Sequence, residues 1–178
     1  MVNFPNIDID SPSESCVLSA IEFINELERQ HEHDPYLVYQ RGNCGDLYKH
    51  LSKIFGDRAQ PYFHYDGFMW KNQHILTRIN GRLYDQRGRI KFGDVGLKFV
   101  FPADAEMVES CCDGYPYDLI EAYNLAIKDG EKITSYEYSK KFAKDFVGVN
   151  TKRDHYRQEN NKAIEHLIAI NKNQHREI

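Results

Sequence analysis

The sequence lacks the features that would place it in a membrane or on a nucleic acid. It has no run of about 18 apolar residues, so no transmembrane helix is expected. Residues 1–15 lack the basic and apolar regions of a signal peptide. Basic residues are not in excess, because 23 Lys and Arg stand against 27 Asp and Glu and the net charge is −4. We therefore expect a cytoplasmic protein with no nucleic-acid or membrane partner.

Cysteine is also scarce, and it is not arranged in a recognisable disulfide or metal pattern. The four cysteines are Cys16, Cys44, Cys111 and Cys112, and no CxxC motif is present. The adjacent Cys111 and Cys112 are poor disulfide partners for each other. This usage predicts reduced thiols in a cytosol and no cofactor. A protein delivered into another cell by a dedicated secretion machine would show the same usage.

The length and apolar content indicate one domain with a real core. The chain has 178 residues, of which 41% are hydrophobic. Strand patterns follow a central helix, which predicts an α+β fold with that helix packed on an antiparallel sheet. We expect a single domain over residues 1–178, with a core at about 11–102 and a helical C-terminal extension at about 115–172. Residues 103–114 are the nearest thing to a linker.

The central helix is expected to begin at a cysteine. Asn43 is a favourable N-cap residue, and apolar residues follow Cys44 at helical spacing until Gly56, a natural stop. Cys44 would then lie at or near the first helical residue. There the free backbone N–H groups and the helix dipole favour a thiolate and could also stabilise an oxyanion.

A β-hairpin is predicted shortly after this helix. The runs Gln73–Ile79 and Arg82–Asp85 are separated by Asn80 and Gly81. Asn-Gly between two such runs is the strongest short hairpin signal, because a type I′ turn needs two positive φ values. A two-residue loop would pair Ile79 with Arg82.

This register would bring together a histidine and an aspartate. Leu76 would then face Asp85, which places His74 and Asp85 as diagonal neighbours on one face, about 7–8 Å apart at the backbone. The carboxylate could fix the imidazole tautomer while the other ring nitrogen meets the thiol of Cys44. The order of the three residues therefore predicts a Cys-His-Asp triad.

These residues also carry a family resemblance. The motif GNCGD at a helix start, followed by QHILTRINGRLYDQRG, resembles the core of transglutaminase-like and papain-like cysteine hydrolases. The resemblance implies that Cys44 is the nucleophile, His74 the base and Asp85 the orienting residue. It implies a hydrolase or acyltransferase (protease, amidase, deamidase or transglutaminase) that forms a thioester with a protein or peptide substrate.

The chain departs from the family pattern in two places. Leu76 stands where an aromatic residue is usual. Gln40 lies only four residues before the cysteine, closer than the oxyanion glutamine of papain-type enzymes. Candidates for oxyanion or substrate contacts are Gln40, Asn43, Trp70 and Gln73.

Further elements are expected on both sides of this stretch. Ser11 to Glu14 form a capping box with Pro12 at the first helical position, which predicts a helix to about Arg29. A polar loop at 30–35 and a short strand or approach to the site at 36–39 should follow. The remaining expectations are strands at 62–65 and within 89–101, helices at about 116–130 and 134–148, and a last helix capped by Asn150.

Other interpretations remain open at the level of sequence. Cys16 is a rival nucleophile, although a core or half-buried thiol is expected there. His64 is a second candidate base. The chain could instead be a binding or inhibitory protein on the same scaffold, or a metal protein that uses Cys44, His64 and His74 as ligands. The histidines of the polar loop, His31 and His33, hint at a metal but are too few for a site.

Overall fold

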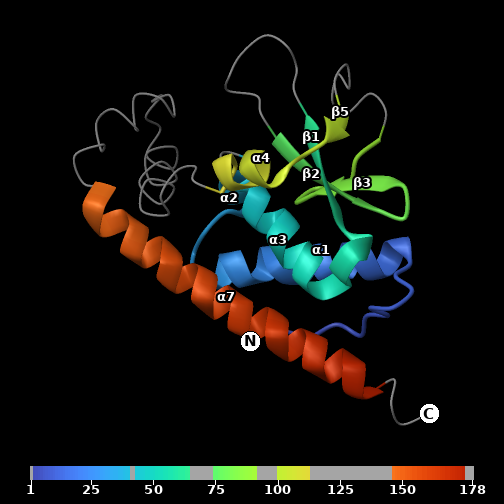
Figure 1. Cartoon of the computed structure of the whole chain (residues 1–178). Coiled ribbons are helices and arrows are strands. Elements are labelled where there is room, and N and C mark those ends of the chain that lie inside the picture. The colour runs from blue at the N-terminus through green and yellow to red at the C-terminus, as the bar shows by residue number, and fades with distance from the viewer. Residues whose placement is uncertain (1, 41–42, 65–73, 92–99, 113–145, 175–178) are drawn as a thin grey trace.

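The computed structural model describes residues 2–40, 43–64, 74–91, 100–112 and 146–174, and it confirms the α+β prediction (Figure 1). One antiparallel sheet has the strand order β4-β3-β2-β1-β5. The strands are β1 (Gln60–His64), β2 (His74–Ile79), β3 (Arg82–Asp85), β4 (Gly88–Arg89) and β5 (Val100–Pro102). The helical elements are α1 (Glu14–Gln30), α2 (Pro35–Gln40), α3 (Cys44–Phe55), η1 (Gly56–Arg58), α4 (Ala105–Ser110) and α7 (Phe146–Gln174).

Helix α3 lies at the centre of the fold. It contacts β1 and β2 of the sheet and the helices α1, α2, α4 and α7. In Figure 1, α7 runs along the molecule on the side away from the sheet, past α1 and α3. Apolar residues of α3 alternate with polar ones at helical spacing, so its buried side joins one core with side chains from α1, β2, β3 and α7. The residue that begins α3 is therefore held by several elements at once.

The hairpin has the predicted register. Thr77 pairs with Tyr84, and Ile79 pairs with Arg82. Asn80 and Gly81 have φ values of 51° and 76°, the two positive values that a type I′ turn requires. The Asn80 side chain also donates a hydrogen bond to the carbonyl of Pro12 at 2.7 Å, which ties the turn to the segment before α1.

Helix α1 begins two residues later than predicted. Its N-cap is Ser13, whose side chain accepts a hydrogen bond from the N–H of Cys16 at 3.2 Å. Ser11 and Pro12 thus precede the helix, and the predicted capping box is wrong. Ser13 takes this position because its extended backbone and its hydroxyl satisfy a first-turn N–H directly.

Residues 36–39, expected as a short strand or as the approach to the site, are helical and belong to α2. Asp34 accepts a hydrogen bond from the N–H of Tyr36 at 2.9 Å, and Pro35 occupies the first helical position. An N-capping Asp followed by Pro is a helix-start signal. This local signal outweighs the β propensity of the short apolar run that follows.

The loop at 30–35 is not simply solvated. The side chains of His33 and Glu28 are fully buried, and His33 Nδ1 lies 3.2 Å from a carboxylate oxygen of Glu28. Tyr39 and Asn160 each donate to the other oxygen of Glu28 at 2.9 Å. One buried carboxylate therefore connects α1, the loop, α2 and α7.

Two predictions about the C-terminal half are wrong. Residues 103–112 are not a linker, because α4 is capped by Asp104 and its Val108 is buried beside Cys111 and Cys112. Helix α7 is already helical from Phe146, so Asn150 does not cap it. Ile164 and Leu167 of α7 are completely buried in the main core. Most of the helices predicted at 116–130 and 134–148 lies outside the described residues.

Candidate active site

Cys44 is the first residue of α3, as predicted, and it is 2% exposed. The N–H of Ile75, next to His74 in β2, donates to its sulfur at 3.3 Å. The sulfur also lies 4.0 Å from the carbonyl oxygen of Cys111. The contact with Ile75 places the thiol against the start of β2, where His74 lies.

The expected lowering of the Cys44 pKa does not occur in this structure. A hydrogen bond with the Cys111 side chain and burial raise the pKa of the Cys44 thiol well above its ordinary value. The N–H of Ile75 acts in the opposite direction but is outweighed. The bond with Cys111 and the loss of solvation both disfavour a thiolate. Cys44 therefore rests as a neutral thiol.

His74 and Asp85 form the predicted pair. Their side chains are almost fully buried, and His74 Nε2 lies 3.2 Å from Asp85 Oδ2. The carboxylate can only accept, so it assigns the ring proton to Nε2. Within the described part of the chain, His74 Nδ1 is buried and has no hydrogen-bond partner. The ring thus keeps a nitrogen lone pair for another group.

Arg87 is a residue of the site that sequence reasoning missed. Its Nη2 lies 2.7 Å from Asp85 Oδ2, and its backbone N–H donates to Oδ1 at 2.8 Å. Burial raises the pKa of Asp85, but the hydrogen bonds from His74 and Arg87 more than offset it, and the pKa is lowered. The signal was available, because Arg87 follows Asp85 by two residues at the end of the hairpin.

Some of the backbone N–H groups at the start of α3, which were expected to bind an oxyanion, already donate hydrogen bonds within the protein. The N–H of Gly45 donates to the carbonyl of Cys111 at 3.0 Å, and the N–H of Asp46 donates to Asn43. No described residue accepts a hydrogen bond from the N–H of Cys44 itself. Among the described residues, this N–H is therefore a first-turn donor that a developing oxyanion could use.

The other oxyanion and substrate candidates are placed less fully. Asn43 is buried at the N-cap position, but its side chain makes no capping hydrogen bond. Gln40 ends α2, and its side chain is not described. Trp70 and Gln73 lie outside the described residues.

The start of α3 is enclosed by α4, which the sequence did not predict. A buried cluster contains Cys44, Phe63, Ile75, Val108, Cys111 and Cys112. A Cβ on Gly45 would overlap the carbonyl oxygen of Val108 and would lie 2.7 Å from the sulfur of Cys112. Glycine is therefore required where α3 and α4 approach.

The alternative nucleophile, Cys16, and the alternative base, His64, lie in different surroundings from Cys44 and the His74–Asp85 pair. Cys16 is half-buried on α1 and packs against the main core rather than this cluster. His64 is buried in β1 and pairs directly with His74 across the sheet. Among the described residues, no three His, Cys, Asp or Glu side chains are grouped to hold a metal ion. None of the four cysteines is in a disulfide.

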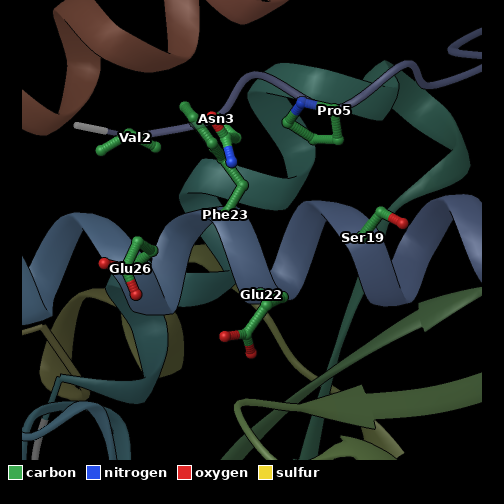
Figure 2. Close-up of a pocket in the computed structure, with 7 residues that line it drawn as sticks. All are labelled: Val2, Asn3, Pro5, Ser19, Glu22, Phe23 and Glu26. Atoms are coloured by element: carbon green, nitrogen blue, oxygen red, sulfur yellow. The ribbon is translucent and has the colours of Figure 1, made fainter.

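Among the described residues, cavities also lie away from this cluster. Figure 2 shows one of about 350 Å³ between the N-terminal segment and α1, lined by Val2, Asn3, Pro5, Ser19, Glu22, Phe23 and Glu26. Another of about 250 Å³ lies between α3 and α7. Its three cations are each paired with a carboxylate, as in the 2.9 Å contact of Arg157 with Asp46. Neither cavity is lined by residues of the Cys44 cluster.

The fold and the site define a small α+β protein with a buried cysteine beside a histidine–aspartate pair. The chain belongs to the phage YunG-like protein family, whose model matches residues 18–142. The matched region contains Cys44, His74 and Asp85 and ends before α7. No curated protein and no solved structure is detectably similar to the chain. None of the described helices has both the length and the apolar character needed to cross a membrane.

Proposed function

We propose that this protein is a cysteine-dependent hydrolase or acyltransferase that uses Cys44, His74 and Asp85. The observation that carries the proposal is the buried contact of 3.2 Å between His74 Nε2 and Asp85 Oδ2, beside a cysteine at a helix start. A buried carboxylate that orients an imidazole, with the other nitrogen open, is the arrangement that activates a nucleophile.

The chemistry follows from the protonation states. The sulfur of Cys44 attacks a carboxamide or ester carbonyl, and the thiol proton passes to His74 Nδ1 as the S–C bond forms. The N–H of Cys44 stabilises the oxyanion. The protonated His74 then gives its proton to the leaving amine or alcohol, and a thioester remains. Water or an amine attacks this thioester and restores the free thiol.

The raised pKa of Cys44 affects the timing of proton transfer. Because the thiol is neutral at rest, His74 must act as a general base during the attack rather than hold a preformed ion pair. Cys44 is also 2% exposed, so an acyl donor reaches the sulfur only after neighbouring side chains move. We therefore expect slow reaction with unselective electrophiles and faster reaction with a fitting substrate.

For the substrate, we propose only a broad class, a protein or peptide that supplies the acyl group. The order of Cys44, His74 and Asp85 resembles that of transglutaminase-like and papain-like hydrolases, in which the acyl donor is a protein or peptide. The apolar side chains of Phe63, Ile75 and Val108 around the sulfur suit an apolar group next to the reacting carbonyl. The proposal includes both water and amines as acceptors of the acyl group.

Acylation by 4-nitrophenyl esters of short N-capped amino acids, followed by intact-mass spectrometry, tests the proposal. We expect one acyl group, mapped to Cys44, that is lost slowly in water and faster with an added amine. Cys44→Ala should form no adduct. His74→Ala should acylate about 10²–10⁴-fold more slowly, the usual contribution of a general base. Cys16→Ala is the matched control and should behave as wild type.

Two outcomes would contradict the triad. One is an adduct that survives in Cys44→Ala, and the other is a His74→Ala variant that acylates at the wild-type rate. Circular dichroism of each variant shows whether the fold persists, so that a loss of acylation is not mistaken for unfolding.

The second candidate function is a binding protein without turnover. The observation in its favour is the nearly complete burial of Cys44 together with its raised pKa. A folded wild-type chain that forms no adduct with any ester or peptide carboxamide would support this second function.

A further inference from the structure

Two cysteines that are distant in sequence lie side by side at the start of α3. Cys44 and Cys111 are both buried in the same cluster. The N–H of Gly45, directly after Cys44, donates to the carbonyl oxygen of Cys111 at 3.0 Å, so their backbones adjoin. The sulfur of Cys44 lies 4.0 Å from that oxygen. The side chain of Cys111 is also the largest cause of the raised pKa of Cys44, in agreement with this geometry.

Cys112 belongs to the same cluster, but its thiol has another partner. It donates to the carbonyl of Val108 in α4 at 3.2 Å. Burial and the carboxylate of Asp46 raise the pKa of Cys112 to about 12, so its thiol is neutral near neutral pH, as that of Cys44 is. Cys16 lies on α1 and packs against the other core cluster. Cys111 is therefore the thiol placed to pair with Cys44.

We propose that Cys44 and Cys111 form a reversible disulfide in exchange with a low-molecular-weight disulfide such as oxidised glutathione. One of the two thiols loses its proton and attacks a sulfur of the small disulfide, and one molecule of the small thiol leaves. The second cysteine then attacks the mixed disulfide and releases the other small thiol. The two protein thiols are oxidised to one disulfide, and the small disulfide is reduced to two thiols.

The geometry favours closure over a lasting mixed disulfide. Disulfides form between cysteines whose Cα atoms are about 4.4–6.8 Å apart, and a direct backbone hydrogen bond beside both residues is compatible with that spacing. Once one thiol has reacted, its partner is already in place. Under the proposed function, the disulfide removes the nucleophile, so oxidation would switch acylation off until a reductant restores it.

Disulfide mapping of the full chain tests this inference. The protein is incubated with excess oxidised glutathione at pH 8, quenched with N-ethylmaleimide, digested and analysed by mass spectrometry. We expect linked peptides that contain Cys44 and Cys111, no N-ethylmaleimide on either of these two cysteines, and full reversal by dithiothreitol. Cys112→Ser and Cys16→Ser should give the same link. Cys111→Ser should lose it and retain glutathione on Cys44.

Three results would overturn the inference. These are a link between Cys111 and Cys112, a stable glutathione adduct on Cys44 of the wild type, and no oxidation of the folded chain at any glutathione ratio. The mapping needs no activity, so the disulfide can be found in a protein that never forms an acyl adduct. Equally, acylation at Cys44 without any link to Cys111 would leave the proposed function intact.

Discussion

The carboxylate of Asp85 contacts two side chains, those of His74 and Arg87. These contacts affect both the stability of the protein and the chemistry of the site. His74 Nε2 contacts Oδ2 at 3.2 Å, and Arg87 contacts the same oxygen at 2.7 Å. The side chain of Asp85 is fully buried, whereas that of Arg87 is 40% exposed. Arg87 therefore helps to keep Asp85 ionised from the solvent side, while His74 uses it from the buried side.

The lowered pKa of Asp85 predicts how stability depends on pH. A carboxyl group whose pKa is lower in the folded state contributes stability above its unfolded pKa of about 3.8, and this contribution is lost as the pH falls through the folded pKa. At pH 7, Asp85→Asn should therefore lower the free energy of unfolding by about 1–3 kcal/mol, the cost of losing charged hydrogen bonds. The difference from wild type should shrink below pH 4.

Urea unfolding between pH 7 and pH 3 measures this effect. Asp57→Asn, at an exposed position in η1, is the matched control and should change stability by less than about 0.5 kcal/mol throughout. A difference between Asp85→Asn and wild type that is the same at pH 3 and at pH 7 would refute the ionic role of Asp85.

At the scale of elements, the approach of α4 to α3 depends on Gly45. The N–H of Gly45 donates to the carbonyl of Cys111, and its missing side chain leaves room for Val108 and Cys112. A helix normally gains from alanine over glycine, by about 1 kcal/mol. Here that gain is opposed by an overlap with the backbone of α4, which cannot move aside as a flexible side chain would.

Gly45→Ala should therefore destabilise the protein by about 1–3 kcal/mol, the usual cost of overpacking, despite its better helix propensity. It should also weaken the Cys44–Cys111 contact, because the separation of α3 and α4 would increase. Urea unfolding gives the free energy. Ser52→Ala on the same helix is the control and should be neutral within about 0.5 kcal/mol. A Gly45→Ala variant more stable than wild type would show that α4 does not pack as described.

At the scale of the whole molecule, α7 joins the core through a buried polar network. The Asn160 side chain donates to Glu28 at 2.9 Å, and its oxygen lies 3.0 Å from His31 Nε2. Asn171, further along α7, accepts a hydrogen bond from the N–H of Ile7 at 2.7 Å. The two ends of the chain are thereby connected through buried side chains as well as through apolar contacts.

Asn160→Ala should lower the free energy of unfolding by about 1–3 kcal/mol, because Glu28 is buried and would lose one of its donors. Hydrogen exchange should show the largest loss of protection in α7 and in the last turn of α1. Lys162→Ala, two residues further along the same helix and exposed, is the control and should change stability by less than about 0.5 kcal/mol. Equal effects of the two substitutions would mean that the network does not hold α7.

The parts that the sequence determined by itself are those encoded by short-range chemistry. The hairpin was predictable because Asn80 and Gly81 tolerate positive φ, and a two-residue turn then sets the pairs next to it, from Ile79 with Arg82 to Thr77 with Tyr84. The start of α3 at Cys44 was predictable because Asn43 is a residue type favoured at the N-cap and the apolar spacing agrees, although the Asn43 side chain makes no capping hydrogen bond. Continued by one pair, that register makes His74 and Asp85 diagonal neighbours, and their side chains are in contact.

Other features were decided only by tertiary packing. The pKa of Cys44 depends on Cys111, which is 67 residues away in sequence, and on burial under α4. His33 is buried because Asn160 on α7 and Tyr39 on α2 complete the surroundings of Glu28. Helix propensities and capping motifs describe only neighbours along the chain, whereas desolvation and buried hydrogen bonds depend on segments far apart. The sequence therefore determined which residues meet in the hairpin, and the tertiary structure decided that the thiol beside them rests in its neutral form.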